Sequence, residues 1–277
     1  MNFYEKNECD VSVVVLSFNS IVYIKKCLDS LFFSFDECNL KGEIIVVDNG
    51  SLDGSVNLLK EIQKLCPNNL SVIFQPHNTG TTKSRNRALK KATGKYILIL
   101  DSDAYMNPQT LNELLKYLFE NSKVGLVSPR LVYPDGRYQM SIDVFPTLAR
   151  KIKRYFNLRS LEENSEIKIT GSVDYAISAC WMLRRNVVNT VGLLDENIFY
   201  SPEDVDYCIR IWKSGYQVHY IPYVSIVHDA QEISRPKGFL INKFTIRHLK
   251  GLFYLFAKHK YIFSLKNLYK KIDRFST

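Results

Sequence analysis

The sequence predicts an α/β fold with a mixed, mostly parallel, Rossmann-like sheet flanked by helices. Short apolar runs alternate with segments that repeat apolar residues at helical spacing, which indicates consecutive β–α–β units. The apolar runs are continuous rather than alternating, as expected of strands covered on both faces. With 277 residues, 46% of them hydrophobic, the chain is long enough to bury one large core.

The first half of the chain contains most of this alternation. Strands are expected at 11–16, 43–47, 71–75 and 96–101, and helices at about 23–33, 55–65, 79–92 and 108–119. After about residue 124 the alternation weakens, and residues 133–172 hold most of the loop signals. The later elements expected are one or two strands in 173–183, a helix over 204–214 followed by Gly215 as its C′ residue, two short strands around Pro222 within 216–227, and a C-terminal helical extension.

The net charge of +9 is concentrated in residues 150–159 and in a basic, aromatic tail from residue 237. Such an excess suits nucleic acid, anionic lipid or a phosphorylated substrate. The tail either lies on a membrane surface or packs on the domain with its charges outward. We expect a cytoplasmic protein, at the inner face of the membrane if the tail binds lipid. The N-terminus lacks an apolar signal segment, no apolar run is long enough to span a membrane, and six scattered cysteines form no CxxC pair.

The segment Asp101-Ser102-Asp103 directly follows an apolar run. In open α/β sheets, ligands bind outside the carboxyl ends of the strands. Two carboxylates at that position suit a divalent cation, and the cation suits a diphosphate. The alternative is a polar turn with a helix cap.

Further polar residues are expected near the same edge of the sheet. Asp48 follows the second strand and could accept from a base or ribose hydroxyl, or cap a turn. In the third helix, Arg85 and Lys83 are early enough to reach a diphosphate, whereas Lys83 and Arg87 share a face from which Arg85 points away. These acids at the strand ends disfavour nucleic acid as a partner.

A second acidic cluster, Glu203, Asp204 and Asp206, begins the helix expected after residue 203. Acids favour the first turn of any helix. The approach Ile198-Phe199-Tyr200 is apolar, however, and apolar surroundings raise the pKa of a carboxylate and suit a general base. His228 follows the last strand and becomes a metal ligand only if the fold brings it beside Asp103; otherwise it is structural.

Five segments in order resemble the family-two, inverting nucleotide-sugar glycosyltransferases with a GT-A fold. They are VSVVVLSFNS, IIVVDNGSLDGS, NTGTTKSRNRALKKATGKYILILDSD, VDYAISACWMLRR and GLLDENIFYSPEDVDYCIRIWKSGYQVHYIPYVSIVH. The match covers about residues 11–230 and extends to the branch with rhamnosyltransferase-like and galactofuranosyltransferase-like enzymes. It departs from the usual pattern at Ile177-Ser178, where a glycine is common, and at Ser201-Pro202.

The resemblance implies a role for each matching position. The implied nucleotide-binding residues are Ser17, Asn19, Asp48, Lys83, Arg85 and Asp101, and the implied ligands of Mn²⁺ or Mg²⁺ are Asp103, His228 and Asp101. Asp204 would be the catalytic base, with Glu203 contacting the acceptor or orienting the base. Contacts to sugar and acceptor would come from Ser178, Ala179, Cys180 and Tyr200.

The expected protein is therefore a metal-dependent enzyme that moves a sugar from a UDP- or dTDP-sugar to a glycan or lipid-linked hydroxyl, in bacterial polysaccharide or glycoconjugate synthesis. The expected division is a GT-A domain over 1–236, with a nucleotide half up to about 125 and an acceptor half from about 126, followed by the tail 237–277. One alternative is a nucleotidyltransferase, which the segment 17–20 disfavours because it lacks Gly and Arg. Others are a membrane-surface binding protein without catalysis and a catalytically inactive scaffold.

Overall fold

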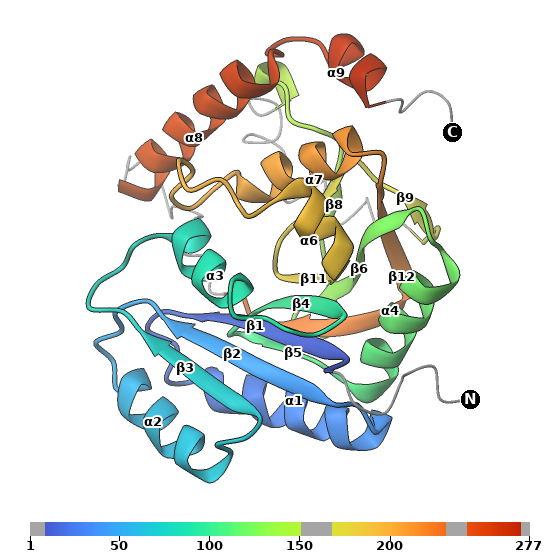
Figure 1. Ribbon diagram of the computed structural model, residues 1–277. Helices are drawn as coiled ribbons and strands as arrows, with labels where there is room; N and C mark the ends of the chain where they lie inside the picture. Colours follow the sequence, from blue (N-terminus) through green and yellow to red (C-terminus); the bar gives the residue numbers. More distant parts are fainter. Residues whose placement is uncertain (1–8, 151–167, 231–242, 273–277) are drawn as a thin grey trace.

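The computed structural model describes residues 9–150, 168–230 and 243–272, with side chains in the last range described from residue 246. Its main sheet has the strand order β3-β2-β1-β4-β11-β6-β12-β5, with β7 and β9 attached at its side. Helices cover both faces, and α8 lies beyond α7 (Figure 1). The predicted α/β class, with a mixed and mostly parallel sheet, is confirmed.

The first half of the chain forms the parallel part of the sheet. Its elements are β1 (Val11–Ser17), α1 (Ile24–Cys38), β2 (Gly42–Asp48), α2 (Ser55–Leu65), β3 (Leu70–Phe74), α3 (Thr81–Leu89), β4 (Tyr96–Asp101), β5 (Ala104–Tyr105) and α4 (Pro108–Glu120). All strands and helices expected here are present. Helix α1 continues past its expected end, and α3 is shorter than expected at both ends.

The apolar strands are buried on both faces because helices cover each side of the sheet. Val13 and Val15 of β1 join the core that includes residues of α1 and α4, whereas Val14 joins the core that includes residues of α3 and α7. All three valines are fully buried. Successive side chains of a strand point to opposite faces, so a strand between two cores is apolar at consecutive positions, as β1 is from Val13 to Leu16.

The second half completes the sheet with strands of both directions. Its elements are β6 (Val124–Val132), β7 (Tyr138–Gln139), β8 (Ile142–Asp143), β9 (Gly171–Ser172), β10 (Tyr175–Ala176), β11 (Cys180–Arg184), α6 (Arg185–Val191), α7 (Glu203–Lys213) and β12 (Gln217–His228). Strand β11 runs antiparallel to both β4 and β6, and β12 runs parallel to β6. Residues 173–183 thus form two strands, and Gly215 follows α7 with a positive φ, as predicted.

The prediction of two short strands around Pro222 was wrong. Strand β12 is continuous, and its pairing with β6 shifts between Ile221, opposite Pro129, and Ser225, opposite Arg130. The extra residues bulge out of the ladder, which accommodates a proline that has no N–H to donate. Strand β6 itself was not predicted, because Pro129 interrupts its apolar run.

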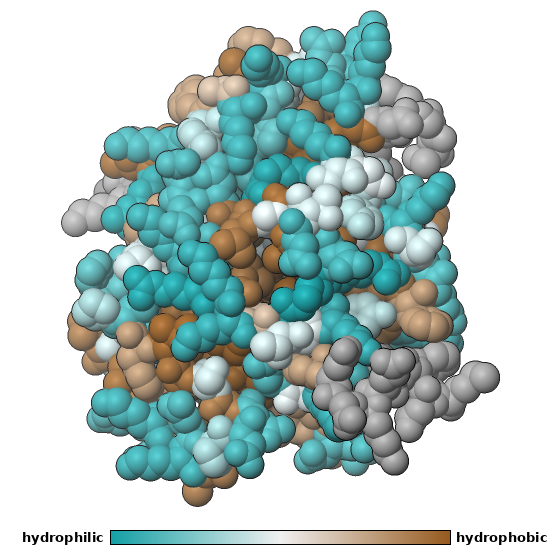
Figure 2. Space-filling model, viewed as in Figure 1, coloured by the Kyte–Doolittle hydropathy of each residue, from teal (hydrophilic) through white to brown (hydrophobic). Residues whose placement is uncertain are grey.

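The C-terminal helices α8 (Lys243–His259) and α9 (Lys266–Lys271) confirm the helical extension. Leu255 and Phe256 of α8 are buried in the same core as residues of α7, so α8 packs directly on the domain. The face of the molecule in Figure 2 is mostly hydrophilic, with scattered hydrophobic residues. Within the described ranges, no helix combines the length and apolar character required to cross a bilayer. Residues 151–159 of the basic segment, and 237–242 and 273–277 of the tail, lie outside the described residues.

Candidate active site

The sheet register brings the acidic strand ends together. Ser17 pairs with Asp48, and Leu16 pairs with Asp101, so β1, β2 and β4 end side by side. On the side of β4 away from β1, β12 pairs antiparallel with β5. This pairing sets His228 opposite Ala104, the residue that follows Asp103. The carboxyl edge of the sheet therefore collects residues from three distant parts of the sequence.

Asp101, Asp103 and His228 each offer a ligand atom, and these atoms lie within 4.8 Å of one another. His228 Nε2 lies 3.3 Å from Asp103 Oδ1 and 3.8 Å from Asp101 Oδ2. Burial lowers the pKa of His228, but the hydrogen bond and charge of Asp103 outweigh burial and raise the pKa overall. Burial also raises the pKa of Asp101, in spite of its ion pair with Arg85.

The donor chemistry and the orientation of His228 fit a cation. Its Nδ1 lies 2.8 Å from Oε1 of Gln139, which can only accept a hydrogen bond, so Nδ1 carries a proton. Nε2 then faces the carboxylates of Asp101 and Asp103. It either carries the second proton of an imidazolium or directs its lone pair at a positive ion. Two carboxylate oxygens and one imidazole nitrogen are a donor set suited to Mn²⁺, and the carboxylates also suit Mg²⁺.

Arg85 links this group to the start of α7. Its side chain is 2% exposed, and its guanidinium lies 2.5 Å from Asp101 Oδ1 and 3.4 Å from Glu203 Oε1. Ser178 completes the connection, since its Oγ accepts from Arg85 at 2.7 Å and donates to Glu203 at 2.9 Å. Lys83 and Arg87 are exposed, which confirms that they lie on a different face from Arg85.

The two acids that begin α7 differ in environment. Glu203 is buried, and burial together with the charge of Asp204 raises the pKa of Glu203 to about 8, although Arg85 and Ser178 oppose the shift. The guanidinium of Arg85 is shared by the carboxyl groups of Glu203 and Asp101, and it lies closer to Asp101. Asp204 is half-buried, and its Oδ1 accepts from the amide of Val205. Of the two carboxyl groups, Asp204 is the more accessible to a substrate.

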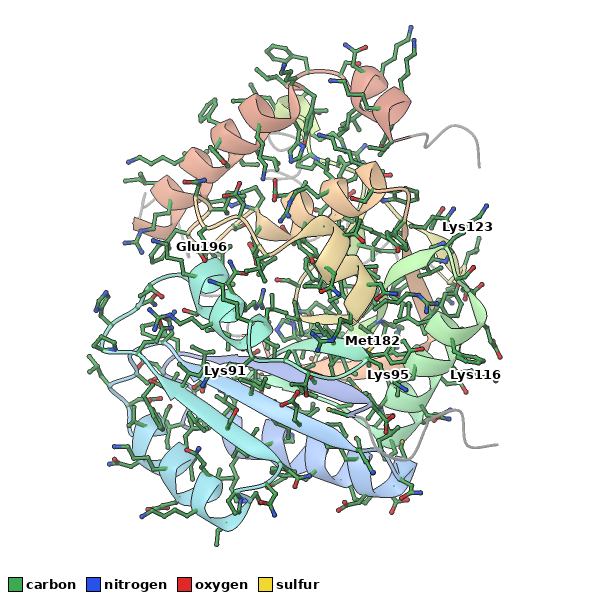
Figure 3. The ribbon with its side chains drawn as sticks, viewed as in Figure 1. Lys91, Lys95, Lys116, Lys123, Met182 and Glu196 are labelled. Atoms are coloured by element: carbon green, nitrogen blue, oxygen red, sulfur yellow. The ribbon has the colours of Figure 1, made fainter. Side chains whose placement is uncertain are left out.

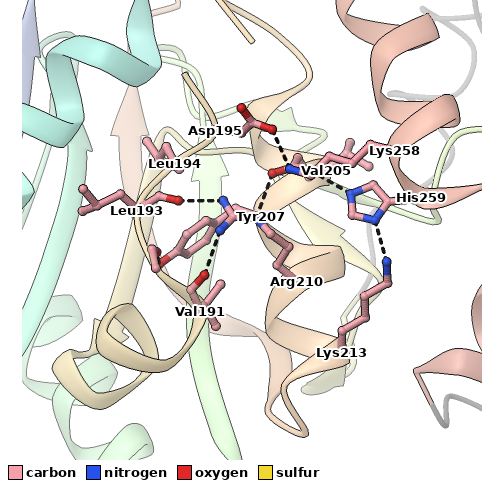
Figure 4. Close-up of polar contacts among 12 residues, drawn as sticks. Val191, Leu193, Leu194, Asp195, Val205, Tyr207, Arg210, Lys213, Lys258 and His259 are labelled. Atoms are coloured by element: carbon pink, nitrogen blue, oxygen red, sulfur yellow. Dashed lines mark hydrogen bonds and ion pairs between the residues drawn. The ribbon is translucent and has the colours of Figure 1, made fainter. Parts of the chain in front are cut away.

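A buried network holds α7 against α8 (Figure 4). Asp206, 1% exposed, accepts from Lys258 at 2.7 Å, His259 at 2.8 Å and Arg210 at 2.9 Å. Lys213 Nζ lies 2.8 Å from His259 Nδ1, and because a lysine can only donate, Nδ1 accepts and Nε2 carries the proton given to Asp206. Burial opposes ionisation of Asp206, but these partners outweigh it and hold its pKa well below the usual range.

The segment before α7 is also held by its neighbours. The carbonyl of Phe199 accepts from the Thr81 amide at the start of α3, and the guanidinium of Arg247 lies 4.0 Å from the centre of the Phe199 ring. His248 Nδ1 lies 3.0 Å from Ser201 Oγ. Glu196, labelled near α3 in Figure 3, accepts from the side chain of Asn86. Helices α3 and α8 therefore both contact the segment that leads into Glu203.

The residues implied for nucleotide binding are placed as follows. Asp48 is fully buried, its Oδ1 accepts from the amides of Gly50 and Ser51, and Ser17 lies beside it at 3.5 Å. Asp48 therefore caps a turn, the alternative that its position left open. Asn19 has φ 50° and accepts from the Leu52 amide. Contact of these residues with a nucleotide stays a prediction.

The residues implied for sugar and acceptor contact are largely enclosed. Ala179 and Cys180 are 3% and 0% exposed and pack in the core, so contact there has to come from Ser178 or from backbone atoms. Tyr200 is half-buried in the segment before α7.

Some site residues were not foreseen. Gln139 orients His228 from β7, and a glutamine in a loop-rich segment carries no pattern that marks it. The contact of Asp206 with Arg210 follows an i,i+4 spacing visible in the sequence, whereas its contacts with Lys258 and His259 depend on where α8 docks.

Comparison with known proteins identifies the family. The model of glycosyl transferase family 2 matches residues 12–192, more than half of the chain. The chain belongs to glycosyltransferase family 2. A pre-mycofactocin glycosyltransferase of Mycobacterium tuberculosis is 28% identical over 226 residues, which cover 79% of this chain and 43% of that protein. Glycosyltransferase AglE of Haloferax volcanii is 26% identical over 84% of this chain and 70% of its own length.

Solved structures support the fold. A mannosyltransferase from Pyrobaculum calidifontis in complex with GDP-Man and Mn²⁺ has a TM-score of 0.64 at 21% identity, covering 96% of this chain and 68% of that chain. Residues 1–349 of S. aureus TarS in complex with UDP-GlcNAc have a TM-score of 0.62 at 18% identity, covering 96% of this chain and 71% of the other. The GT-A-like architecture of this family 2 protein is thus shared with both.

Proposed function

We propose that this family 2 protein is a metal-dependent, inverting glycosyltransferase that moves a sugar from a nucleoside-diphosphate sugar to a hydroxyl acceptor. The observation that carries the proposal is the convergence of Asp101, Asp103 and His228 at the carboxyl edge of the sheet. Arg85 joins this group to Glu203, the residue before Asp204 at the start of α7. This arrangement pairs a cation site suited to a diphosphate with a carboxylate suited to a general base.

Each residue has a distinct task in this proposal. Asp101, Asp103 and His228 hold the cation, and when bound, Mn²⁺ or Mg²⁺ neutralises charge on the departing nucleoside diphosphate. Asp204 takes the proton of the acceptor hydroxyl, whose oxygen bonds to the anomeric carbon as the bond from that carbon to the diphosphate oxygen breaks. Attack from the opposite side inverts the anomeric centre in one displacement.

Arg85 and Glu203 act as positioning residues in this proposal, instead of contacting the diphosphate and the acceptor. Arg85 is enclosed between Asp101 and Glu203, so its charge orients the carboxylate of Asp101 and fixes the start of α7. Ser178 bridges the same two groups through its hydroxyl. The proposed donor is a UDP- or dTDP-sugar, as in the rhamnosyltransferase-like and galactofuranosyltransferase-like branch, and the proposed acceptor is a glycan or lipid-linked hydroxyl in bacterial glycoconjugate synthesis.

Donor binding and hydrolysis test this function directly. A panel of UDP-, dTDP- and GDP-sugars is screened for thermal stabilisation and for release of the nucleoside diphosphate, with and without Mn²⁺ or Mg²⁺. We expect stabilisation by one nucleotide class and metal-dependent release. Binding of no nucleotide sugar, or equal release in chelator, contradicts the proposal. Release of pyrophosphate from a nucleoside triphosphate and a sugar phosphate would instead identify a nucleotidyltransferase.

A further inference from the structure

The solvent-facing side of α8 is apolar. Leu252, Leu255 and Phe256 are buried on the domain side of the helix, as expected of a docked amphipathic helix. Residues three or four apart share a helix face. On the outer face, however, Ile246, Leu249 and Phe253 follow one another at this spacing, with exposed fractions of 45%, 47% and 62%. The helix is therefore apolar on both sides.

The turn after α8 extends this character. Ile262 and Phe263 are 43% and 76% exposed, and the loop that joins α8 to α9 lies along the same upper edge of the molecule as α8 (Figure 1). Hydrophobic residues are interspersed with hydrophilic ones along this edge in Figure 2. We call the five residues Ile246, Leu249, Phe253, Ile262 and Phe263 the apolar ridge.

Positive charge surrounds the apolar ridge. Residues 243–272 contain no Asp or Glu in the sequence. Exposed cationic side chains are spread along both helices and the loop between them: Arg247, Lys250, Lys260, Lys266, Lys270 and Lys271. Exposed apolar side chains framed by lysine and arginine match the chemistry of an anionic lipid surface. A second copy of this chain would bring like charge against like charge.

We propose that the apolar ridge docks this protein on the surface of an anionic lipid bilayer. Ile246, Leu249 and Phe253 enter the interface between headgroups and acyl chains, and the surrounding cations contact lipid phosphates. The helix lies in the plane of the surface, since its other side is buried against α7. This inference does not depend on the proposed transfer reaction.

Docking of α8 on a bilayer would place the lipid surface near the proposed catalytic base, Asp204. Arg247 contacts Phe199, and His248 contacts Ser201, both in the segment that leads into Glu203 and Asp204. A bilayer under α8 therefore lies beside the proposed acceptor side. A hydroxyl acceptor carried on a lipid would reach the base without leaving the membrane surface.

Vesicle flotation of the full chain tests the proposal. The probes are vesicles of phosphatidylcholine alone and of phosphatidylcholine with about 30% phosphatidylglycerol, which makes the surface anionic. We expect flotation only with the anionic vesicles, and loss of flotation at high salt because salt screens the cations. Loss of a single cation, as in Lys250→Gln, is expected to weaken binding by about fivefold.

A matched pair of variants separates the ridge from general surface hydrophobicity. Phe253→Gln removes an aromatic ring that is 62% exposed on α8, and Phe33→Gln removes one that is 57% exposed on α1. We expect the first to lower vesicle binding at least about tenfold and the second to leave it unchanged, with both thermal midpoints near that of the wild type because both positions are exposed.

Three outcomes would overturn the proposal: no flotation with anionic vesicles, equal loss in the two phenylalanine variants, or self-association that Phe253→Gln abolishes in a protein that does not float. The last result would assign the ridge to a second copy of the chain. Nucleotide-sugar binding is measured on the same samples, so failure of the membrane proposal is distinguishable from failure of the proposed transferase function.

Discussion

Replacing Asp206 by asparagine provides a quantitative test of the network that holds α7 against α8. Oδ1 of Asp206 accepts from Lys258 and His259, and Oδ2 accepts from Arg210. In either orientation, the amide introduced by Asp206→Asn would direct its NH₂ group at one of these donors. Removing one partner of a buried ion pair costs about 3–5 kcal/mol.

The lower end of that range applies, because Lys258 and Arg210 are 26% and 19% exposed and can relax into water. We therefore expect Asp206→Asn to lower the free energy of unfolding by about 3 kcal/mol and the thermal midpoint by about 6–12 °C. Urea unfolding at pH 7 measures the first quantity and a thermal scan the second.

The effect has a defined pH dependence. The pKa of folded Asp206 lies below its usual value, so its carboxylate stabilises the folded state above about pH 4, and that contribution is lost as the pH falls through the folded pKa. Asp206→Asn and the wild type should therefore differ fully at pH 6–8 and converge in acid.

Asp29→Asn is the control, because Asp29 forms a surface pair with Lys25 in which the side chains are 57% and 62% exposed. Exposed pairs contribute at most about 1 kcal/mol, and this i,i+4 pair about 0.5 kcal/mol or less. A loss below about 1 kcal/mol for Asp206→Asn, or a loss equal to that of the control, would refute the reasoning.

Three further predictions concern the site itself. Asp204→Asn should lower turnover about 10²–10⁴-fold while nucleotide affinity, measured by calorimetry, stays unchanged; near-normal transfer would remove Asp204 as the base. Asp103→Asn and His228→Ala should each weaken Mn²⁺ binding, followed by its electron paramagnetic resonance signal, and chelator should abolish wild-type activity until metal is restored; full activity in chelator contradicts the metal assignment. The raised pKa of Glu203, about 8 against a usual 4.5, means that the folded state retains a proton that the unfolded state loses, so this group lowers stability as the pH rises from about 4.5 to 8. In unfolding experiments with chelator, Glu203→Gln should flatten the decline of the free energy of unfolding with pH. An identical pH profile in the wild type and the variant would show that Glu203 is ionised throughout.

The sequence was most informative where local pattern and burial agree. The apolar runs of β1, β2 and β4 predicted both the strands and the edge at which they end, because each strand lies between two cores. The position of Arg85 on a different helix face from Lys83 also followed from periodicity alone. These predictions needed only the geometry of single elements.

Other features depend on contacts between elements that no local pattern encodes. Periodicity could not show that Arg85 is enclosed by Asp101 and Glu203, which come from β4 and α7. Gln139 carries no motif, yet it determines which nitrogen of His228 faces the carboxylates. Strand β6 was missed because a proline such as Pro129 normally argues against an inner strand. Here the neighbouring strand β12 bulges next to Pro129, directly after Ile221.

The pairing of β12 with β5 has a consequence for how the protein is made. Asp101 and Asp103 leave the ribosome long before His228, and the three donors meet only after the last strand of the sheet has found its place beside β5. A nascent chain that ends before β12 can form the parallel β–α–β units but cannot assemble the complete ion site. In the proposed function, a cation held by all three donors would therefore bind only after β12 has paired with β5, and it would stabilise the finished sheet rather than guide its assembly.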